Sequence, residues 1–177
     1  MKKIKHIQAP LSDKDIAGLK AGDEVLLSGE IYAARDQAHL RITGMIKDRA
    51  KLPFDLKGQV IYYCGPAPSG KRIIGSCGPT TSGRMDPFTP ELLAAGIKGM
   101  IGKGRRDASV VKAIKRFSAV YLVAPAGAGA YLMSRVKKCE VVAFEDLGPE
   151  AVYRMTVEDF PLVTCIDCKG RDLYDKM

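Results

Sequence analysis

Tryptophan is absent from this 177-residue sequence, and histidine occurs only twice, as His6 and His39. Two histidines are too few for a zinc-hydrolase site built on imidazole ligands. A Ser/His/Asp triad would have to use His39, and no nucleophile-elbow motif accompanies it. Lys and Arg are scattered without a run of five or more, and aromatic residues are not interleaved with them as stacking platforms. These absences weigh against a hydrolase and against nucleic-acid binding.

Signals for secretion and for membrane insertion are also lacking. The basic start, MKKIKH, is not followed by the apolar core of a signal peptide. The longest uncharged stretch, residues 117–134, is interrupted by Pro125, Gly127 and Gly129. We therefore interpret it as a buried strand followed by a Gly-rich loop, not as a membrane span. The odd number of cysteines, five, argues against a disulfide framework and favours a reducing cytoplasm. Because no membrane span is predicted either, we expect a cytoplasmic protein without a membrane partner.

Cys165 and Cys168 form the closest pair of cysteines in the sequence. A structural zinc or cluster site needs a second pair, and Cys64, Cys77 and Cys139 are scattered singly. In a strand, side chains three residues apart point to opposite faces. We expect the pair to be buried thiols, and we expect no metal site in this chain.

The composition that is present is typical of a globular protein, with 46% hydrophobic and 27% charged residues. The length is that of a single domain, residues 1–177, large enough to bury a substantial core. The 28 Lys and Arg exceed the 20 Asp and Glu, which gives a net charge of +8. This excess favours an anionic partner, either nucleic acid or a small acidic substrate.

Hydrophobic spacing and Gly/Pro punctuation predict a mixed α/β protein. Strands are predicted at residues 24–33 (with a kink at Gly29), 58–66, 71–79, 97–104, 119–124, 139–145 and 161–174. Helices are predicted after Ser12 and at residues 88–96 (with Thr89 as N-cap), 107–117, 127–138 and 148–160. A β-rich first half therefore precedes an alternating β/α second half. This order implies a partly parallel sheet, in which ligands bind at the carboxyl ends of strands.

One loop has the composition of an anion-binding segment. Residues 78–86, GPTTSGRMD, place three hydroxyl side chains between two glycines, and an arginine and an aspartate follow. Residues 78–85 and 65–72 both imitate a phosphate-binding loop, but neither has the complete Gly-Lys-Ser/Thr ending that holds phosphate and magnesium. Arg84 and Lys103 each lie near the end of a predicted strand, so we expect both at the ligand-binding edge of the sheet.

Cationic and hydroxyl side chains with no obvious nucleophile make up the candidate site. Its members are Arg35, Thr80, Thr81, Arg84 and Lys103. A guanidinium can grip a carboxylate through two hydrogen bonds, so three converging cations would suit a small dicarboxylate. The alternative is that the arginines form ordinary ion pairs, Arg84 with Asp86 and Arg35 with Asp36 or Asp48, and that Lys103 is solvated.

The segments that carry these residues resemble one known family. GEIYAARDQAHLR, GPTTSGRMD with its downstream GKG, and FPLVTCIDCKGRDLY are similar to the class I, iron–sulfur-dependent fumarate hydratases. More narrowly, they resemble the small β subunit, or C-terminal domain, that this family shares with L-tartrate dehydratase. The resemblance extends from about residue 8 to the end of the chain. It implies a swivelling β/β/α domain.

The resemblance also implies roles for individual residues. The family's dicarboxylate contacts fall on Thr80 and Arg84 of the TT-x-x-R loop, on Lys103 of the KG motif and on Arg35 of the RD-x-AH motif. Thr80 is the implied base, although a threonine hydroxyl is a poor base without help. On this pattern Thr80 and Lys103 are the candidate catalytic residues, and Thr81 adds a further hydroxyl beside them.

In that family a [4Fe–4S] cluster is held by cysteines of the other, α subunit. The resemblance therefore implies that this chain supplies the cationic half of a shared pocket, that it is inactive alone, and that fumarate and (S)-malate are interconverted there. L-Tartrate is the alternative substrate. A different class of function, a stand-alone module that binds anions or nucleic acid, also fits the charge of +8.

Overall fold

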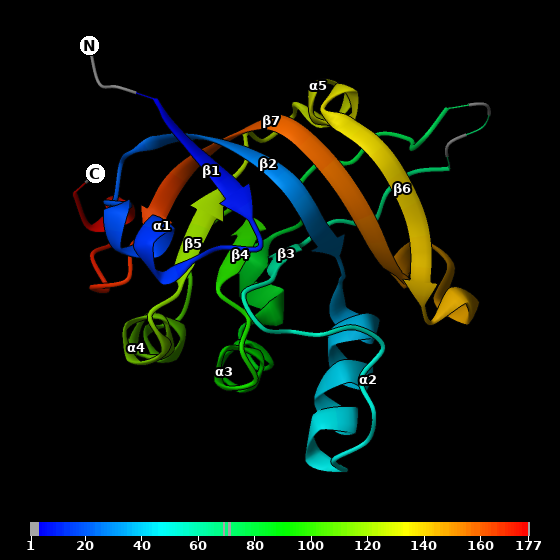
Figure 1. Ribbon diagram of the computed structural model, residues 1–177, viewed down its shortest axis with the longest axis horizontal. Coiled ribbons are helices and arrows are strands. Elements are labelled where there is room, and N and C mark those ends of the chain that lie inside the picture. Colours follow the sequence, from blue (N-terminus) through cyan, green and yellow to red (C-terminus); the bar gives the residue numbers. More distant parts are fainter. Residues whose placement is uncertain (1–3, 69, 71, 177) are drawn as a thin grey trace.

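The computed structural model describes residues 4–68, 70 and 72–176 (Figure 1). The strands are β1 (Lys5–Ala9), β2 (Glu24–Ala33), β3 (Val60–Tyr62), β4 (Gly99–Gly102), β5 (Val120–Val123), β6 (Val136–Ala143) and β7 (Val152–Ile166). The helices are α1 (Asp13–Gly18), α2 (Asp36–Lys47), α3 (Thr89–Ala94), α4 (Ala108–Phe117) and α5 (Gly129–Ser134), with 3₁₀ turns η1 (Ser82–Met85), η2 (Glu145–Glu150) and η3 (Leu173–Lys176). Within the described residues, no helix has the length and apolar character needed to cross a membrane.

Strand pairing closes a ring around the interior of the protein. The neighbours β2, β3, β4 and β5 are parallel, and α2, α3 and α4 lie in turn on the connections between them. Strand β7 runs antiparallel to both β5 and β2, which joins the two ends of this parallel set. Strands β1 and β6 extend the sheet beside β2 and β7. The parallel arrangement brings the carboxyl ends of β2, β3 and β4 to one edge.

Two hydrophobic clusters lie on the two faces of the parallel strands. Successive side chains of a strand point to opposite faces, so Tyr62 belongs to one cluster while Ile61 and Tyr63 belong to the other. The first cluster continues into Phe160 of β7 and fills the inside of the ring. The second continues into Ile42 of α2, and Figure 1 shows α2, α3 and α4 together on that side of the strands. The result is a layer of helices packed against two layers of strands.

Several predicted elements are confirmed. β2 has the predicted bounds, and the predicted kink at Gly29 coincides with a register shift between Leu27 and Gly29 in the pairing with β7. Ser12 and Asp15 form a capping box at the start of α1. The strands β4 and β5 and the helix α4 lie within the predicted residues 97–104, 119–124 and 107–117.

The helix predicted at residues 148–160 is wrong. Residues 148–150 end the 3₁₀ turn η2, and residues 152–160 belong to β7, which pairs with β2, β5 and β6. The buried Val152 and Met155 are three residues apart and so imitate a helical spacing. Hydrogen-bonded neighbours on both sides of the strand decide the outcome, because tertiary pairing overrides local propensity.

Three further predictions need correction. Residues 72–79 form no strand, and residue 71 of the predicted strand lies outside the described residues, as does part of the phosphate-loop imitation at 65–72. Helix α5 is shorter than predicted because the residues from Val136 onward belong to β6. Phe88, not Thr89, occupies the N-cap position of α3, and the Thr89 hydroxyl donates to Met85 O at 2.8 Å.

The α/β class is confirmed, but the order of elements differs from the prediction. Alternation of strands and helices occupies residues 24–123, and the antiparallel strands β6 and β7 follow. Strand β1 and helix α2 were not predicted. The buried face of α2 includes His39 and Thr43 beside Ala38 and Ile42, so its apolar periodicity is weak in the sequence.

Gly29 tests the bulge in β2. Its φ is 107°, and a Cβ there would overlap Ala9 O and Gln8 Nε2. We predict that Gly29→Ala lowers the free energy of unfolding by at least about 2 kcal/mol, through backbone strain and overpacking. Gly44→Ala is the matched control, because Gly44 lies inside α2 with nothing within 4 Å of its Cβ position, and it should stabilise by about 0.5–1 kcal/mol. Equal effects of the two changes in urea unfolding would refute the assignment of the bulge.

Candidate active site

Two of the predicted cations, Arg35 and Lys103, lie at the carboxyl ends of parallel strands. Ala33, the last residue of β2, pairs with Tyr62, the last residue of β3, and Tyr62 pairs with Ile101 of β4. Arg35 follows β2 by two residues, and Lys103 directly follows β4. Both residues therefore leave the sheet at the same edge, the one at which open α/β sheets bind ligands.

The loop at residues 78–86 lies across this edge. The amide of Thr80 donates to Tyr63 O at 2.7 Å, just beyond β3. Thr81 forms an isolated parallel bridge with Lys103, and the amide of Ser82 donates to Lys103 O at 2.9 Å. The structure thus brings Thr80, Thr81 and Lys103 together although no strand precedes the loop.

Ser82 joins the loop to the Gly-Lys-Gly segment. Its buried Oγ accepts from the amide of Lys103 at 3.0 Å and lies 2.9 Å from the hydroxyl of Tyr121. A Cβ on Gly102 would overlap this Oγ, so the residue before Lys103 has to be glycine. Burial raises the pKa of Tyr121, which keeps the phenol protonated as a hydrogen-bond donor.

Arg84 pairs with Asp36, not with Asp86. Arg84 Nε donates to Asp36 Oδ1 at 3.1 Å, and Nη2 donates to Oδ2 at 2.8 Å. The Arg84 side chain is half exposed, whereas that of Asp36 is 22% exposed. These two hydrogen bonds connect the loop to Asp36, the residue that follows Arg35, although 48 positions separate Arg84 from Asp36 in the sequence.

Arg35 is held by a different carboxylate from the expected Asp36. Its Nη2 lies 3.6 Å from Glu150 Oε1, while Glu150 Oε2 accepts from the amide of Gln37 at 3.0 Å in the first turn of α2. Arg35 Nε is buried and has no partner among the described residues. A Cβ on Gly65 would lie 2.6 Å from Arg35 Nη1, so the glycine after Cys64 makes room for this guanidinium.

A completely buried arginine that the sequence reasoning missed supports the loop from beneath. Arg106 Nε donates to Asp86 Oδ1 at 2.6 Å, and its Nη2 donates to Thr89 Oγ1 at 2.7 Å. Its guanidinium lies over the rings of Tyr63 and Tyr121, 5.2 and 4.9 Å from their centroids. The sequence shows only an adjacent pair of arginines after Lys103, and it does not indicate which of them is buried.

His39 is completely buried, so its ring cannot reach a substrate as a catalytic base. Its Nδ1 lies 2.7 Å from Arg35 O, a contact that requires the proton on Nδ1. Burial lowers the pKa of His39 to about 4, and the charge of Arg106 acts in the same direction. The ring lies against Tyr63 and Phe88 and fixes the carbonyl of Arg35 at the start of α2.

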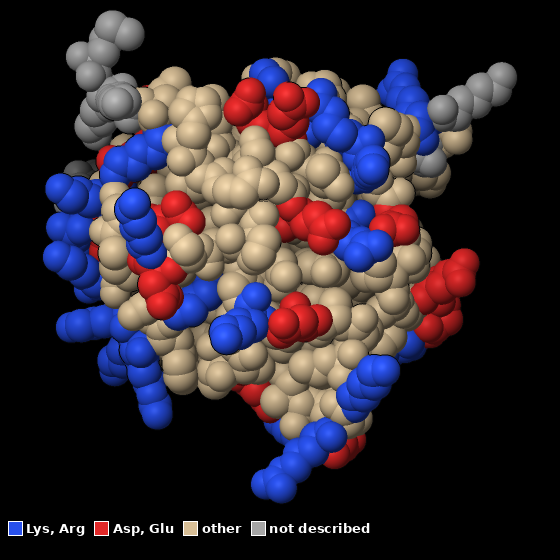
Figure 2. Space-filling view, in the orientation of Figure 1, with Lys and Arg blue, Asp and Glu red and all other residues tan. Residues whose placement is uncertain are grey.

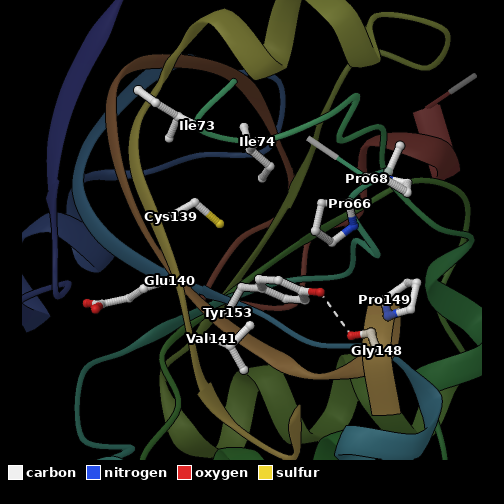
Figure 3. Close-up of a pocket in the computed structure, with 11 residues that line it drawn as sticks. Pro66, Pro68, Ile73, Ile74, Cys139, Glu140, Val141, Gly148, Pro149 and Tyr153 are labelled. Atoms are coloured by element: carbon white, nitrogen blue, oxygen red, sulfur yellow. Dashed lines mark hydrogen bonds between the residues drawn. The ribbon is translucent and has the colours of Figure 1, made fainter. Parts of the chain in front are cut away.

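An apolar groove lies beside Arg35 but is unsuited to a dicarboxylate. Figure 3 shows its walls, formed by the segment around Pro66 and Ile74 on one side and by Cys139, Val141 and Tyr153 on the other. Its volume is about 380 Å³, and among the described residues its lining includes Glu140 but no lysine or arginine. A doubly charged anion would be desolvated there without a counter-ion, so the strand-end edge is the better candidate.

Charge on the surface is mixed on the face in view. Figure 2 shows Lys and Arg concentrated along the left edge of the molecule, while carboxylates and cations alternate over the rest of that face. Away from that edge, this face therefore carries no broad basic surface.

The described part of the chain offers no ligand set for an iron–sulfur cluster. Among the described residues, no group of three or more His, Cys, Asp or Glu side chains is arranged to hold a metal ion. Cys165 and Cys168 pack into the two different hydrophobic clusters, as predicted from their spacing, and the Cys165 thiol donates to Asp172 Oδ1 at 3.6 Å. Cys64 and Cys77 lie in hydrogen-bond contact with Cys139 nearby, but these thiols are not arranged to hold a metal ion.

Comparison with known proteins assigns the chain to a family. The family described as fumarase C-terminus matches residues 1–177. The chain belongs to the fumarase C-terminus family.

Relatives within this family differ in length. A Methanocaldococcus jannaschii protein provisionally named L(+)-tartrate dehydratase subunit beta is 40% identical over 174 residues, which cover 94% of this chain and 89% of that protein. Fumarate hydratase 1 of Leishmania major is 41% identical over 155 residues, and the aerobic class I fumarate hydratase of Escherichia coli is 36% identical over 178 residues. These matches cover 85% and 98% of this chain but only 28% and 31% of those enzymes. The chain thus spans about a third of the length of the named fumarate hydratases.

The buried ion pair gives a first prediction for this site. Asp86→Asn leaves the Arg106 charge uncompensated in the interior, so it should lower the free energy of unfolding by about 3–5 kcal/mol. The double variant Asp86→Asn/Arg106→Met should cost less than the sum of the two single changes. Urea unfolding of the four proteins measures both effects. A loss below about 1 kcal/mol for Asp86→Asn, or strict additivity, would contradict the pairing.

His39 gives a second prediction. Its pKa is lower in the folded protein than in the unfolded chain, where it is near 6.5, so the unfolded chain binds the proton first. The contribution of neutral, buried His39 to the free energy of unfolding is complete above pH 6.5 and is lost as the pH falls toward 4. About 2 kcal/mol of the free energy of unfolding is lost at pH 5. Urea unfolding at pH 7 and pH 5 should show a smaller difference for His39→Gln than for wild type. His6→Gln, which alters a 70% exposed side chain, should keep the wild-type difference; an equal difference in all three proteins would refute the assignment.

Proposed function

We propose that this chain is the β subunit of a two-subunit hydro-lyase that interconverts fumarate and (S)-malate. The observation that carries the proposal is the connection of three separated motifs at one edge of the sheet. The Arg84 side chain donates two hydrogen bonds to Asp36, the residue after Arg35. The main chain of Lys103 is hydrogen-bonded to the Thr-Thr-Ser loop. Membership of the fumarase C-terminus family, in which longer relatives are named fumarate hydratases, supports the same reaction.

The two arginines are proposed to bind the carboxylates of the substrate. Arg84 retains Nη1 without a hydrogen-bond partner among the described residues, and Arg35 has only a 3.6 Å contact with Glu150. Each guanidinium therefore keeps free donors for a planar carboxylate. Thr81, which is exposed beside Lys103, adds a hydroxyl to the same pocket.

Lys103 and Thr80 are the proposed catalytic residues. During hydration of the double bond, negative charge accumulates on the carboxylate next to the carbon that gains or loses a proton. The Lys103 ammonium, which is held by a fixed backbone, would stabilise this charge. The Thr80 hydroxyl is the group that we propose to carry the proton, and it needs a neighbouring charge to act because its own pKa is far from neutral.

The second half of the pocket is proposed to come from an α subunit. This chain spans about a third of the fumarate hydratases that it resembles, so the remaining chain in those enzymes corresponds to the proposed partner. We assign the [4Fe–4S] cluster, whose open iron would serve as the Lewis acid, to that partner. On this division the chain is inactive alone, and all five of its cysteines, which are free, suit a reducing cytoplasm.

The domain is also proposed to be of the swivelling β/β/α type. Two strand layers and one helix layer support this assignment. Residues 1–177 would then form a single domain that approaches the partner as a unit.

L-Tartrate dehydratase is the second candidate. The specific observation in its favour is the M. jannaschii relative, which is named for that activity, is 40% identical and is covered over 89% of its length. L-Tartrate differs from malate by one hydroxyl, and the same cations would hold either dicarboxylate. Turnover of (S)-malate and L-tartrate by the complex of both chains decides between the two.

Arg84→Ala tests the proposal. In the complex with a cluster-loaded α subunit, loss of a charge-assisted carboxylate contact should reduce kcat/KM for fumarate by about 30- to 1000-fold. The disappearance of fumarate absorbance measures this rate. Arg154→Ala is the matched control, since Arg154 is a half-exposed arginine that binds Glu140 through Nε and Nη2 on β6 and β7. Unchanged activity of Arg84→Ala, or an equal loss in Arg154→Ala, would contradict the proposal.

A further inference from the structure

We infer that Asp36 is a positioning residue for Arg84, which it holds so that the guanidinium presents its free end to a substrate carboxylate. The inference rests on the proposed function and adds a residue to it. It starts from the atoms that form the Arg84–Asp36 ion pair.

Asp36 uses one edge of the guanidinium and leaves another edge open. A guanidinium has five N–H donors: one on Nε and two on each Nη. Asp36 accepts from Nε at 3.1 Å and from Nη2 at 2.8 Å. The two protons of Nη1 and one proton of Nη2 remain, and they form a fork that a second carboxylate can occupy without displacing Asp36.

Asp36 itself is a fixed anchor. It is the first residue of α2 and lies between two tethered positions: Ala34, whose amide donates to Tyr62 O at 3.0 Å, and Gln37, whose amide donates to Glu150. A carboxylate in the first turn of a helix is also stabilised by the helix dipole. Its side chain is 22% exposed, compared with 50% for Arg84. The flexible partner is therefore the arginine, and the ion pair restricts it.

Restriction matters because a free arginine loses side-chain entropy when it binds a ligand. A long, half-exposed side chain samples many rotamers, and fixing them costs free energy at the moment of binding. An arginine that is already fixed avoids this loss. Asp36 should therefore strengthen dicarboxylate binding in the ground state and the transition state alike, which affects KM more than kcat.

The competing role for Asp36 is that of a counter-ion that blocks Arg84. A carboxylate that neutralises Arg84 or occupies its binding face would have to be displaced by the substrate. Removing it would then tighten dicarboxylate binding. The two roles predict opposite signs for the same substitution, and the open Nη1 edge favours the positioning role.

Binding of succinate to the two-subunit complex, followed by calorimetry, tests the inference without requiring turnover. Succinate is a four-carbon dicarboxylate with no double bond. We expect Asp36→Ala to raise its Kd by about tenfold or more, the size of effect expected from losing a charge-assisted pair. Asp36→Asn keeps the shape and one acceptor oxygen, so it should fold normally and show a smaller rise. KM for fumarate should follow Kd, while kcat changes less.

A double-variant cycle separates positioning from general structural damage. In the Arg84→Ala background, Asp36→Ala should have no further effect on the Kd of succinate, because the group that it positions is gone. Glu140→Ala removes the carboxylate of the similar Arg154–Glu140 pair and should leave Kd unchanged. An unchanged or lower Kd in Asp36→Ala, or a full effect of Asp36→Ala without Arg84, would overturn the inference. A further outcome is that succinate binding follows these expectations although the complex has no hydratase activity. That result would overturn the proposed reaction and leave the role of Asp36 intact.

Discussion

The charge of Arg106 constrains this end of the protein more than any other group. Its side chain is completely buried, and a buried guanidinium is tolerated only when its donors and its charge are matched. Asp86 supplies the charge and at the same time accepts from the amide of Asp107 at 2.8 Å. The loop that carries Thr80 and Arg84 and the segment that follows Lys103 are therefore locked to each other, and neither can shift without breaking a buried ion pair.

Above this layer, the chain keeps its exposed cations in place with its own carboxylates. Asp36 holds Arg84, and Glu150 contacts Arg35 while it caps the start of α2. Asp36 begins α2 whereas Arg84 lies in the loop at residues 78–86, and Glu150 lies in η2 whereas Arg35 follows β2. Each contact therefore fixes two segments of the chain relative to one another. Both arginines keep unpaired donors, which is the condition under which a cationic site binds an added anion and does not collapse onto its own acids.

The sequence was informative where one residue type has one physical use. Ser12 as a helix cap, Gly29 as a break in β2, and a strand within residues 97–104 that delivers Lys103 at its carboxyl end were predicted correctly because each depends on local chemistry. Residues 148–160 were predicted incorrectly because β7 depends on pairing with three strands distant in sequence. The partners of Arg84 and Arg35 were missed for the same reason: adjacent acids were expected, but Asp36 and Glu150 are brought in by the fold. The sequence alone does not indicate whether Arg106 or its exposed neighbour Arg105 points into the interior.

We propose that Arg35 and Lys103, at the carboxyl ends of β2 and β4, and Arg84, in the loop beside them, together bind the two carboxylates of one substrate, next to chemistry supplied by a partner. A crystal structure of the two-subunit complex with (S)-malate bound tests it most directly. We expect one carboxylate within about 3.2 Å of Arg84 Nη1, with Arg84 Nε still bound to Asp36, and Lys103 Nζ facing the same ligand. Malate held entirely by the partner chain, with Arg84 and Lys103 directed into solvent, would contradict it.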